Sequence, residues 1–126
     1  GLAHSGKDMS NPGSVGTLGM LLETSGKGAR LDMDRIPAPD GVDFSQWLMS
    51  YQGCGFVVTC DPANSQEILD IFRGAQLAAE VVGKITDPPL FVLESDDREE
   101  VLFDFSRDII TGCKPDSIKG RNSRFK

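Results

Sequence analysis

Several residue types that build reactive or cross-linked sites are scarce in this chain of 126 residues. It has three cysteines, Cys54, Cys60 and Cys113, and no two of them have the spacing of a CxxC motif. This odd, irregularly spaced set argues against a disulfide framework or a zinc site and fits a reducing cytoplasm, which is the localisation we expect. Cys60 lies in an apolar run and is predicted to be a small core residue.

Histidine is scarcer still, because His4 is the only one. Its place at the extreme N-terminus offers no context for a Ser-His-Asp triad, so we predict that it is disordered and not catalytic. The sequence also lacks a GxxxxGK[ST] loop, a signal peptide and any apolar run of about twenty residues. We therefore expect no Walker-type nucleotide site and no membrane partner.

Positive charge is in deficit, since 13 basic and 19 acidic residues give a formal net charge of −6. This balance argues against a nucleic-acid-binding surface. Acidic side chains gather in "ESDDREE", residues 94–100, which we interpret as a solvated turn, whereas the last eight residues, "KGRNSRFK", are basic. The length and the 39% hydrophobic content fit one domain, which we place at residues 1–113, followed by a basic, flexible tail at 114–126.

Hydrophobic periodicity and capping residues predict a mixed α/β domain that begins with a loop at residues 1–13. The first helix is expected at 12–25, with Pro12 in its first turn, Ser10 or Asn11 as its cap and a glycine at its end. Asp43 and Asp61 are the predicted N-caps of two further helices, at 44–51 and 61–74. Strands are expected at 29–33, 56–60, 77–85, 90–94 and 101–105.

Two finer expectations concern these strands. Residues 56–60 form a continuous apolar run and are predicted to be a buried strand, and the last two strands are predicted to form a hairpin around the acidic turn. The unit formed by residues 56–85 resembles half of a ferredoxin-like layer, with helices packed on a mostly antiparallel sheet. Trp47 and Tyr51 share a helix face and are interpreted as core or domain-interface residues.

Glycine is abundant in and just before the first predicted helix, where it lowers helix stability. Residues 6–37 hold six of the fourteen glycines, some of them within a predicted helix where each costs about 1 kcal/mol against alanine. The glycines before the helix fit a loop that approaches a phosphate, because a helix N-terminus favours anions, and Lys7 adds a positive charge. Gly16 and Gly19 are predicted to allow close packing of the helix on a sheet. The alternative for the whole loop is an ordinary capped helix start.

The stretch "KDMSNPGSVGTLGMLLETSGKGARLDMDRIP", residues 7–37, resembles the start of the C-terminal domain of the AIR synthase superfamily. "GCGFVVTCDPANSQEILDIF", residues 53–72, and "AAEVVGKIT", residues 78–86, resemble later parts of that domain in the same order. The superfamily includes aminoimidazole ribonucleotide synthetase, selenophosphate synthetase, thiamine-monophosphate kinase and a hydrogenase maturation factor. The likeness is strongest to uncharacterised AIR synthase-related proteins. It implies a three-layer α/β (α+β) domain, with a mixed sheet and purine-biosynthesis-like chemistry.

In this family the loop before the helix often reads His-Asp-x-Ser-Asp-Gly-Gly-Leu. This chain keeps Asp8, Ser10 and Gly13 but has Lys7 and Asn11 where histidine and the second aspartate would stand, and Pro12 replaces a glycine. Because Asn is a poorer Mg²⁺ ligand than Asp, we assign no metal ligand in this loop. The resemblance implies a loop that binds a substrate or a phosphate, made of Lys7, Asp8, Ser10, Asn11, Gly13 and Ser14.

The resemblance also implies that the chain is a fragment, the substrate-side domain of an ATP-dependent enzyme. The parent would carry an N-terminal domain that binds most of the ATP and Mg²⁺ and forms a homodimer, and the fragment alone would be inactive. The expected reaction is phosphoryl transfer from ATP to an oxygen, carboxylate or amide of a small phosphorylated or acidic metabolite, with the catalytic residues unassigned. The alternative is a non-catalytic ligand-binding or regulatory module of the same fold, which the changes at Asn11 and Pro12 favour slightly.

Overall fold

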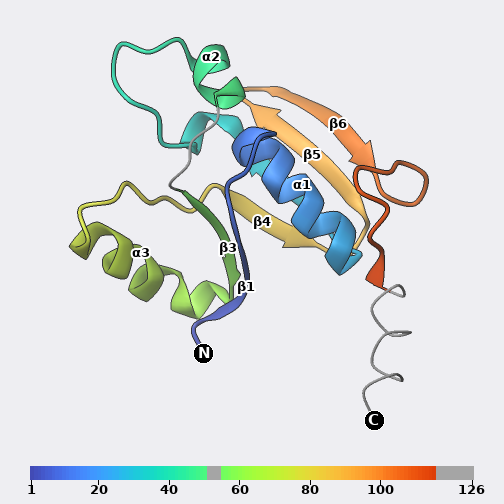
Figure 1. Cartoon of the computed structure of the whole chain (residues 1–126), viewed down its shortest axis with the longest axis horizontal. Helices are drawn as coiled ribbons and strands as arrows, with labels where there is room; N and C mark the ends of the chain where they lie inside the picture. The colour runs from blue at the N-terminus through green and yellow to red at the C-terminus, as the bar shows by residue number, and fades with distance from the viewer. Residues whose placement is uncertain (51–54, 116–126) are drawn as a thin grey trace.

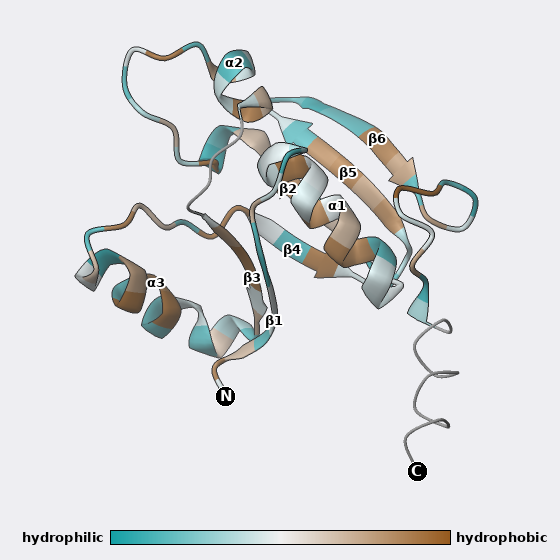
Figure 2. Ribbon diagram, in the orientation of Figure 1, coloured by the Kyte–Doolittle hydropathy of each residue, from teal (hydrophilic) through white to brown (hydrophobic). Residues whose placement is uncertain are grey.

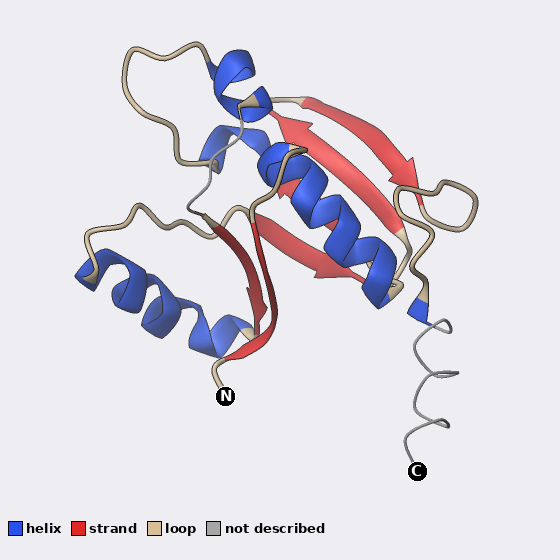
Figure 3. Cartoon of the chain, in the orientation of Figure 1, coloured by secondary structure: helices blue, strands red, loops and turns tan. Residues whose placement is uncertain are grey.

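The computed structural model describes residues 1–50 and 55–115. Among the described residues, helical segments alternate with strands over most of the chain (Figures 1 and 3). Short 3₁₀ helices carry the label η. The elements in order are β1 (Ala3–Asp8), α1 (Gly13–Ser25), β2 (Gly28–Asp32), η1 (Met33–Arg35), α2 (Phe44–Met49), β3 (Phe56–Cys60), η2 (Pro62–Asn64), α3 (Ser65–Gly74), β4 (Gly83–Thr86), β5 (Leu90–Ser95) and β6 (Arg98–Asp104). None of the described helices combines the length and the apolar character that a membrane crossing requires.

The larger sheet has four strands in the order β4-β2-β5-β6, and α1 lies across one of its faces (Figure 1). β2 runs parallel to β5, whereas the β2–β4 and β5–β6 pairs are antiparallel. Apolar residues colour much of β5, the strand beneath α1 (Figure 2). The buried cluster between helix and sheet consists of Leu18, Leu22, Ala29, Leu31, Phe91 and Phe105. This layer of helix on sheet is the core of the domain.

A second sheet contains only β1 and β3, which pair antiparallel beside α3 (Figure 1). The hydroxyls of Ser5 and Thr59 share a hydrogen bond of 2.6 Å across this pair. The prediction of a loop at residues 1–13 is therefore wrong for residues 3–8, and His4 is an exposed residue of a strand instead of a disordered one. The sequence "AHSGKD" contains none of the strand-favouring residues Val, Ile, Thr, Phe, Tyr and Trp, so its strand depends on the distant partner β3.

The predicted mixed α/β class is confirmed, but the strand assignments need three corrections. β3 is partly exposed instead of buried, and Phe56 is 59% exposed. In place of the strand expected at 77–85, the structure has the shorter β4 (Gly83–Thr86), because the ladder with β2 covers those residues alone. β3 and β4 then join different sheets, so residues 56–85 do not form the predicted ferredoxin-like layer.

The predicted helices are confirmed with small changes at their ends. The Asp43 carboxylate accepts from the Gln46 N–H at 2.9 Å and caps α2, whereas Asp61 caps the short η2 helix that leads into α3. Pro12 is itself the N-cap of α1, and neither Ser10 nor Asn11 provides a side-chain cap. Gly26 ends α1 in the left-handed conformation with φ 65°, as expected.

The glycines of α1 have different neighbours. A Cβ on Gly19 would lie 2.9 Å from Ile110 Cδ1 and 3.6 Å from a ring carbon of Phe91 in β5, which confirms close packing of helix on sheet. A Cβ on Gly16 would instead meet the ring of Pro12, so Gly16 serves the helix start and not the sheet contact.

The β5–β6 hairpin is confirmed, but its turn is shorter than the acidic stretch 94–100. Only Asp96 and Asp97 lie between the strands. Glu94 and Glu99 are strand residues, and both pair with Arg30 of β2. The hydrogen bonds that Arg30 donates to these two carboxylates, that to Glu99 first, raise the pKa of its guanidinium. The acidic stretch is therefore partly neutralised within the sheet.

Two cysteines and Trp47 lie within the described residues. Cys60 is half-buried and Cys113 exposed, and both are free thiols. Tyr51, Cys54 and residues 116–126 of the expected tail lie outside the described residues. The indole N–H of Trp47 donates to the Pro37 carbonyl at 3.0 Å, so this side chain links α2 to the segment after η1.

Glu23 is a buried carboxylate, with 3% of its surface exposed, near the end of α1. Its two oxygens accept from the backbone N–H groups of Ile110, Thr111 and Gly112 and from the Thr111 hydroxyl, at 2.6 to 3.1 Å. Burial acts to raise the pKa of this carboxyl, but the hydrogen bonds from Thr111, Ile110 and Gly112 outweigh it and lower the pKa to about 2. Glu23 thus fastens the segment after β6 to α1.

Candidate functional site

The six residues of the predicted binding loop lie on one connection between a strand and a helix. Lys7 and Asp8 are the last residues of β1, Ser10 and Asn11 follow in the loop, and α1 begins at Gly13. The Met9 N–H donates to the Gly55 carbonyl at 2.8 Å and holds the loop beside the start of β3. The structure therefore places these residues close together, as their sequence spacing requires.

Charge at this loop is partly compensated. The Lys7 ammonium lies 3.6 Å from an Asp8 carboxylate oxygen, and their side chains are 33% and 75% exposed. An exposed pair at this distance is weak, so an incoming anion has only a small interaction to replace at Lys7. Lys7 is the basic residue among the six and the natural contact for an acidic group.

Two local hydrogen bonds hold the loop at the start of α1. The Gly13 N–H donates to the Ser10 carbonyl at 2.8 Å, and the Ser10 N–H donates to the Thr17 hydroxyl at 3.1 Å. Gly13 has φ 71°, and a Cβ on it would collide with the Leu48 carbonyl of α2. Close approach of α2 thus explains the glycine at position 13 without a ligand.

The electrostatics of this helix end still favour an anion. The N–H groups in the first turn of an α-helix lack intrahelical acceptors, and the helix dipole adds partial positive charge there. In α1 no side chain caps these groups and no acidic residue lies in the first turn. Within the described residues, no group of three or more His, Cys, Asp or Glu side chains is placed to hold a metal ion. We assign no metal ligand in the loop at residues 7–14.

An acidic hollow of about 520 Å³ lies away from the loop, at the β5–β6 turn. Its lining consists of Asp32, Asp34, Glu94, Ser95, Asp96, Asp97, Arg98 and Glu99. Both oxygens of Asp34 accept hydrogen bonds of 2.9 Å, from the Ser95 hydroxyl and the Asp96 N–H. These carboxylates are largely occupied by the protein itself.

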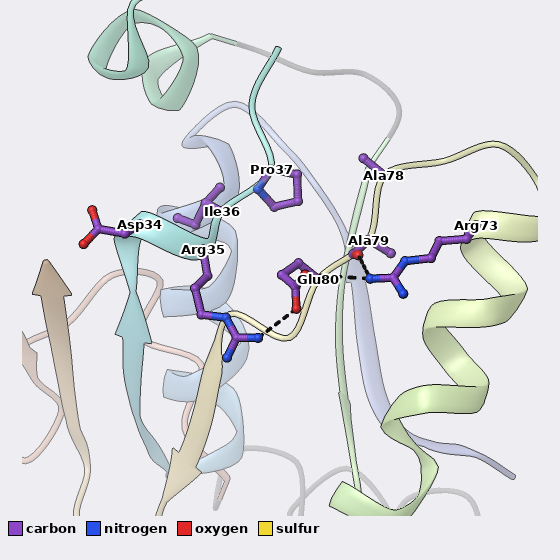
Figure 4. Close-up of a pocket in the computed structure, with 8 residues that line it drawn as sticks. All are labelled: Asp34, Arg35, Ile36, Pro37, Arg73, Ala78, Ala79 and Glu80. Atoms are coloured by element: carbon purple, nitrogen blue, oxygen red, sulfur yellow. Dashed lines mark hydrogen bonds and ion pairs between the residues drawn. The ribbon is translucent and has the colours of Figure 1, made fainter. Parts of the chain in front are cut away.

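A second hollow, of about 490 Å³, lies between η1, the end of α3 and the segment that precedes β4 (Figure 4). Its lining consists of Asp34, Arg35, Ile36, Pro37, Arg73, Ala78, Ala79 and Glu80. Here the guanidinium groups of Arg35 and Arg73 both approach the Glu80 carboxylate, with nitrogen–oxygen distances of 2.8 Å and 3.7 Å. We call this cavity the arginine hollow.

Sequence reasoning did not find the arginine hollow. Arg35 and Arg73 are 38 positions apart in the chain, and Glu80 lies in a segment that was predicted to be a strand. No spacing rule connects such residues, because packing between separate elements brings them together. The local signal available was that Arg35 and Arg73 each stand in the last turn of a helix.

Comparison with known sequences identifies the family. The family model described as "AIR synthase related protein, C-terminal domain" matches residues 1–96. The uncharacterized protein MJ0640 of Methanocaldococcus jannaschii is 44% identical over 112 residues, which cover 89% of this chain and 35% of MJ0640. The PurL subunit of phosphoribosylformylglycinamidine synthase from Staphylococcus epidermidis is 26% identical over 92 residues, which cover 72% of this chain and 13% of that subunit.

Solved structures share the fold. PurL of T. maritima complexed with FGAR aligns with a TM-score of 0.70 and 21% identity, over 86% of this chain and 19% of that one. A chain of the HypE–HypF complex aligns with a TM-score of 0.67 and 18% identity, over 79% of this chain and 35% of that one. PurLQS from Thermotoga maritima, also an assembly, aligns with a TM-score of 0.68 and 23% identity, over 79% of this chain and 18% of that one.

This chain therefore spans about a third of the length of MJ0640 and a smaller share of the PurL proteins. The resemblance read from residues 7–37, 53–72 and 78–86 is confirmed by the family model and by these relatives. The chain belongs to the AIR synthase related protein family and corresponds to its C-terminal domain.

Proposed function

We propose that this chain is the substrate-side domain of an ATP-dependent, AIR synthase-like enzyme. The enzyme would transfer the phosphoryl group of ATP to an oxygen, carboxylate or amide of a small phosphorylated or acidic metabolite. The T. maritima PurL, whose fold this domain shares, has been solved in complexes with ATP, ADP and FGAR. In this proposal the parent also carries an N-terminal domain, which would bind most of the ATP and Mg²⁺ and form a homodimer, and the present chain alone would be inactive. The length of MJ0640, of which the chain covers 35%, leaves room for such a domain.

The observation that carries the proposal is the connection from β1 to α1. It places Lys7 on the strand that leads to an α-helix N-terminus free of acidic residues and of a side-chain cap. Helix N–H groups and a nearby ammonium together favour a phosphate or a carboxylate. In this proposal Lys7 and the backbone N–H of Ser14 contact the acidic group, while Asp8, Ser10 and Asn11 present polar side chains to the remainder of the substrate.

The test is substrate-stimulated ATP hydrolysis by the full-length protein with Mg²⁺, screened against a panel of phosphorylated metabolites. Lys7→Ala is expected to raise KM for the stimulating metabolite by about tenfold, the loss of one charge-assisted contact. Lys27→Ala is the matched control, because Lys27 lies just past the other end of α1 and pairs with exposed Asp87 at 2.7 Å. Equal KM values in both variants would show that the loop does not bind the substrate. Absence of ATP hydrolysis with every metabolite would contradict the proposal that the full-length protein is an enzyme.

A non-catalytic ligand-binding or regulatory module is the second candidate. Two observations favour it: the carboxylate of Asp8 is paired with Lys7, and Asn11 supplies an amide where the family's motif has a second carboxylate. Saturable binding of a phosphorylated metabolite by the full-length protein, without any ATP hydrolysis, would support this candidate over the enzyme.

A further inference from the structure

The arginine hollow carries more positive charge than its ion pairs neutralise. Arg35 and Arg73 contribute two positive charges, and Glu80 contributes one negative charge. Asp34 also lines the hollow, but its carboxylate turns away from the two arginines and is held by Ser95 and Asp96 (Figure 4). In a chain whose net charge is −6, this is a local concentration of guanidinium groups within a concave surface.

Both guanidiniums retain unused hydrogen-bond donors. Nη2 of Arg35 donates to Glu80 Oε1 at 2.8 Å, and Nη2 of Arg73 donates to the Ala79 carbonyl at 3.1 Å and approaches Glu80 Oε2 at 3.7 Å. For each arginine, Nε and Nη1 have no partner among the residues that the structure describes. A planar guanidinium presents five N–H donors and binds carboxylate or phosphate oxygens in pairs, so most of this capacity is open.

Glu80 occupies the place of an anion in this arrangement. Its carboxylate lies between two guanidiniums that come from different elements, and it also accepts the Val81 N–H at 2.9 Å. The Val81 N–H first, and then the Arg35 guanidinium, lower the pKa of this carboxyl, so Glu80 is ionised at neutral pH. Glu80 belongs to residues 77–82, which form neither a helix nor a strand.

We propose that the arginine hollow binds a small-molecule oxyanion, a phosphate or a carboxylate, which displaces Glu80 from Arg35 and Arg73. The cavity of about 490 Å³ is large enough for a ligand of metabolite size. The apolar part of its lining, Ile36, Pro37 and Ala78, supplies a wall for the carbon skeleton of such a ligand. The site shares no residue with the loop at positions 7–14, so it stands independently of the function proposed above.

The experiment is a titration of the intact chain with inorganic phosphate and, separately, with succinate, followed by two-dimensional NMR at constant ionic strength. We expect saturable shifts at the Arg35 and Arg73 side-chain N–H signals and at the backbone of residues 78–81. The anion with the lower dissociation constant identifies the class of ligand. Sodium chloride titrated over the same range serves as the control for general screening.

Variants at Arg73 and Glu80 are expected to change the affinity for the anion in opposite directions. Arg73→Gln is expected to weaken binding about tenfold, because it removes one of two charge-assisted contacts. Glu80→Gln is expected to strengthen binding several-fold, since it removes the competing carboxylate. If the ion pairs of Glu80 with Arg35 and Arg73 only stabilise the fold and bind no ligand, Glu80→Gln will not raise the affinity for the anion. Arg107→Gln and Glu100→Gln are the matched controls: Arg107 is 77% exposed and paired at Asp104 and Asp108, and Glu100 is exposed on β6.

Three results would overturn the proposal. The first is the absence of saturable shifts with both anions. The second is equal affinity in Arg73→Gln and Arg107→Gln. The third is an affinity in Glu80→Gln that equals or falls below that of the unmodified chain. Because the Glu80→Gln prediction is a gain of affinity, a poorly folded variant cannot imitate it.

Discussion

Replacement of Glu23 by glutamine tests whether the segment after β6 is held by a charged hydrogen-bond acceptor. The buried carboxylate receives four hydrogen bonds, three of them from consecutive backbone N–H groups at positions 110–112. Glutamine keeps the size of the side chain but turns one acceptor oxygen into an NH₂ donor that faces other donors. At least one buried N–H is then left without a partner, which is costly.

The magnitude follows from the pKa of this carboxyl, which falls from 4.5 to about 2. At about 1.4 kcal/mol for each tenfold change in proton affinity, the ionised carboxylate contributes roughly 3 kcal/mol to the free energy of unfolding at neutral pH. We therefore expect Glu23→Gln to lower that free energy by roughly 2–4 kcal/mol. Thr111→Val removes the hydroxyl that donates to Glu23 and accepts from the Cys113 N–H, and it is expected to cost roughly 1–2 kcal/mol.

The assay is urea denaturation of both variants and of the unmodified chain at a series of pH values from 7 to 3. Because the folded pKa lies below the unfolded one, the contribution of Glu23 is complete above about pH 4.5 and is lost as the pH falls toward 2. The difference between the unmodified chain and Glu23→Gln should thus shrink by more than half by about pH 3. Glu100→Gln, at an exposed position, is the control and should change stability by less than about 0.5 kcal/mol.

Either of two results would refute this reasoning. A loss below about 1 kcal/mol at pH 7 would mean that the four hydrogen bonds do not outweigh the cost of burying the charge. A larger loss that stays constant from pH 7 to pH 3 would assign the effect to packing and not to ionisation of the carboxyl.

Two substitutions at glycines test the contacts of α1. Gly13→Ala should lower the free energy of unfolding by roughly 2 kcal/mol or more, because φ is 71° and the new methyl group meets the rigid Leu48 carbonyl. If urea denaturation shows that this variant is more stable than the unmodified chain, the close approach of α2 to Gly13 is contradicted. Gly19→Ala should change it by less than about 1 kcal/mol, since the nearest atom, at 2.9 Å, is the flexible end of Ile110 and alanine favours the helix. Gly19→Leu should cost clearly more, by roughly 1–3 kcal/mol, and a neutral result in thermal unfolding would refute close packing on β5.

Elements with local signals were predictable from the sequence. α2 and α3 follow capping aspartates, Asp43 and Asp61, and α1 ends at a glycine, because each of these signals acts within a few residues. β1 was missed because its strand depends on pairing with residues about fifty positions away. Residues 77–82 carry apolar side chains that are typical of a strand, but the ladder of β4 with β2 starts at Gly83, and Val82 adds a single bond to it by accepting from the Asp32 N–H at 2.8 Å.

The candidate site was predictable only where it is continuous in the chain. The loop at residues 7–14 was found from its glycines and its resemblance to a family motif, and its role as a binding site stays a prediction. The reason offered for Gly13 was incomplete, because the collision with the Leu48 carbonyl depends on how α2 packs. The arginine hollow combines η1, α3 and residues 78–80, so it could be found only after folding brought these segments together.

The pairing of β1 with β3 has a geometrical consequence for Lys7, which stands opposite Val57. A shift of the ladder by two residues would keep Lys7 on the same side of the sheet but move it about 7 Å along the strand, and a shift by one residue would turn it to the opposite side. A residue inserted or deleted within β1 would therefore have to be absorbed by a change of strand register or by a bulge. The position of Lys7 along the sheet is thus fixed by hydrogen bonds to a segment about fifty residues further along the chain.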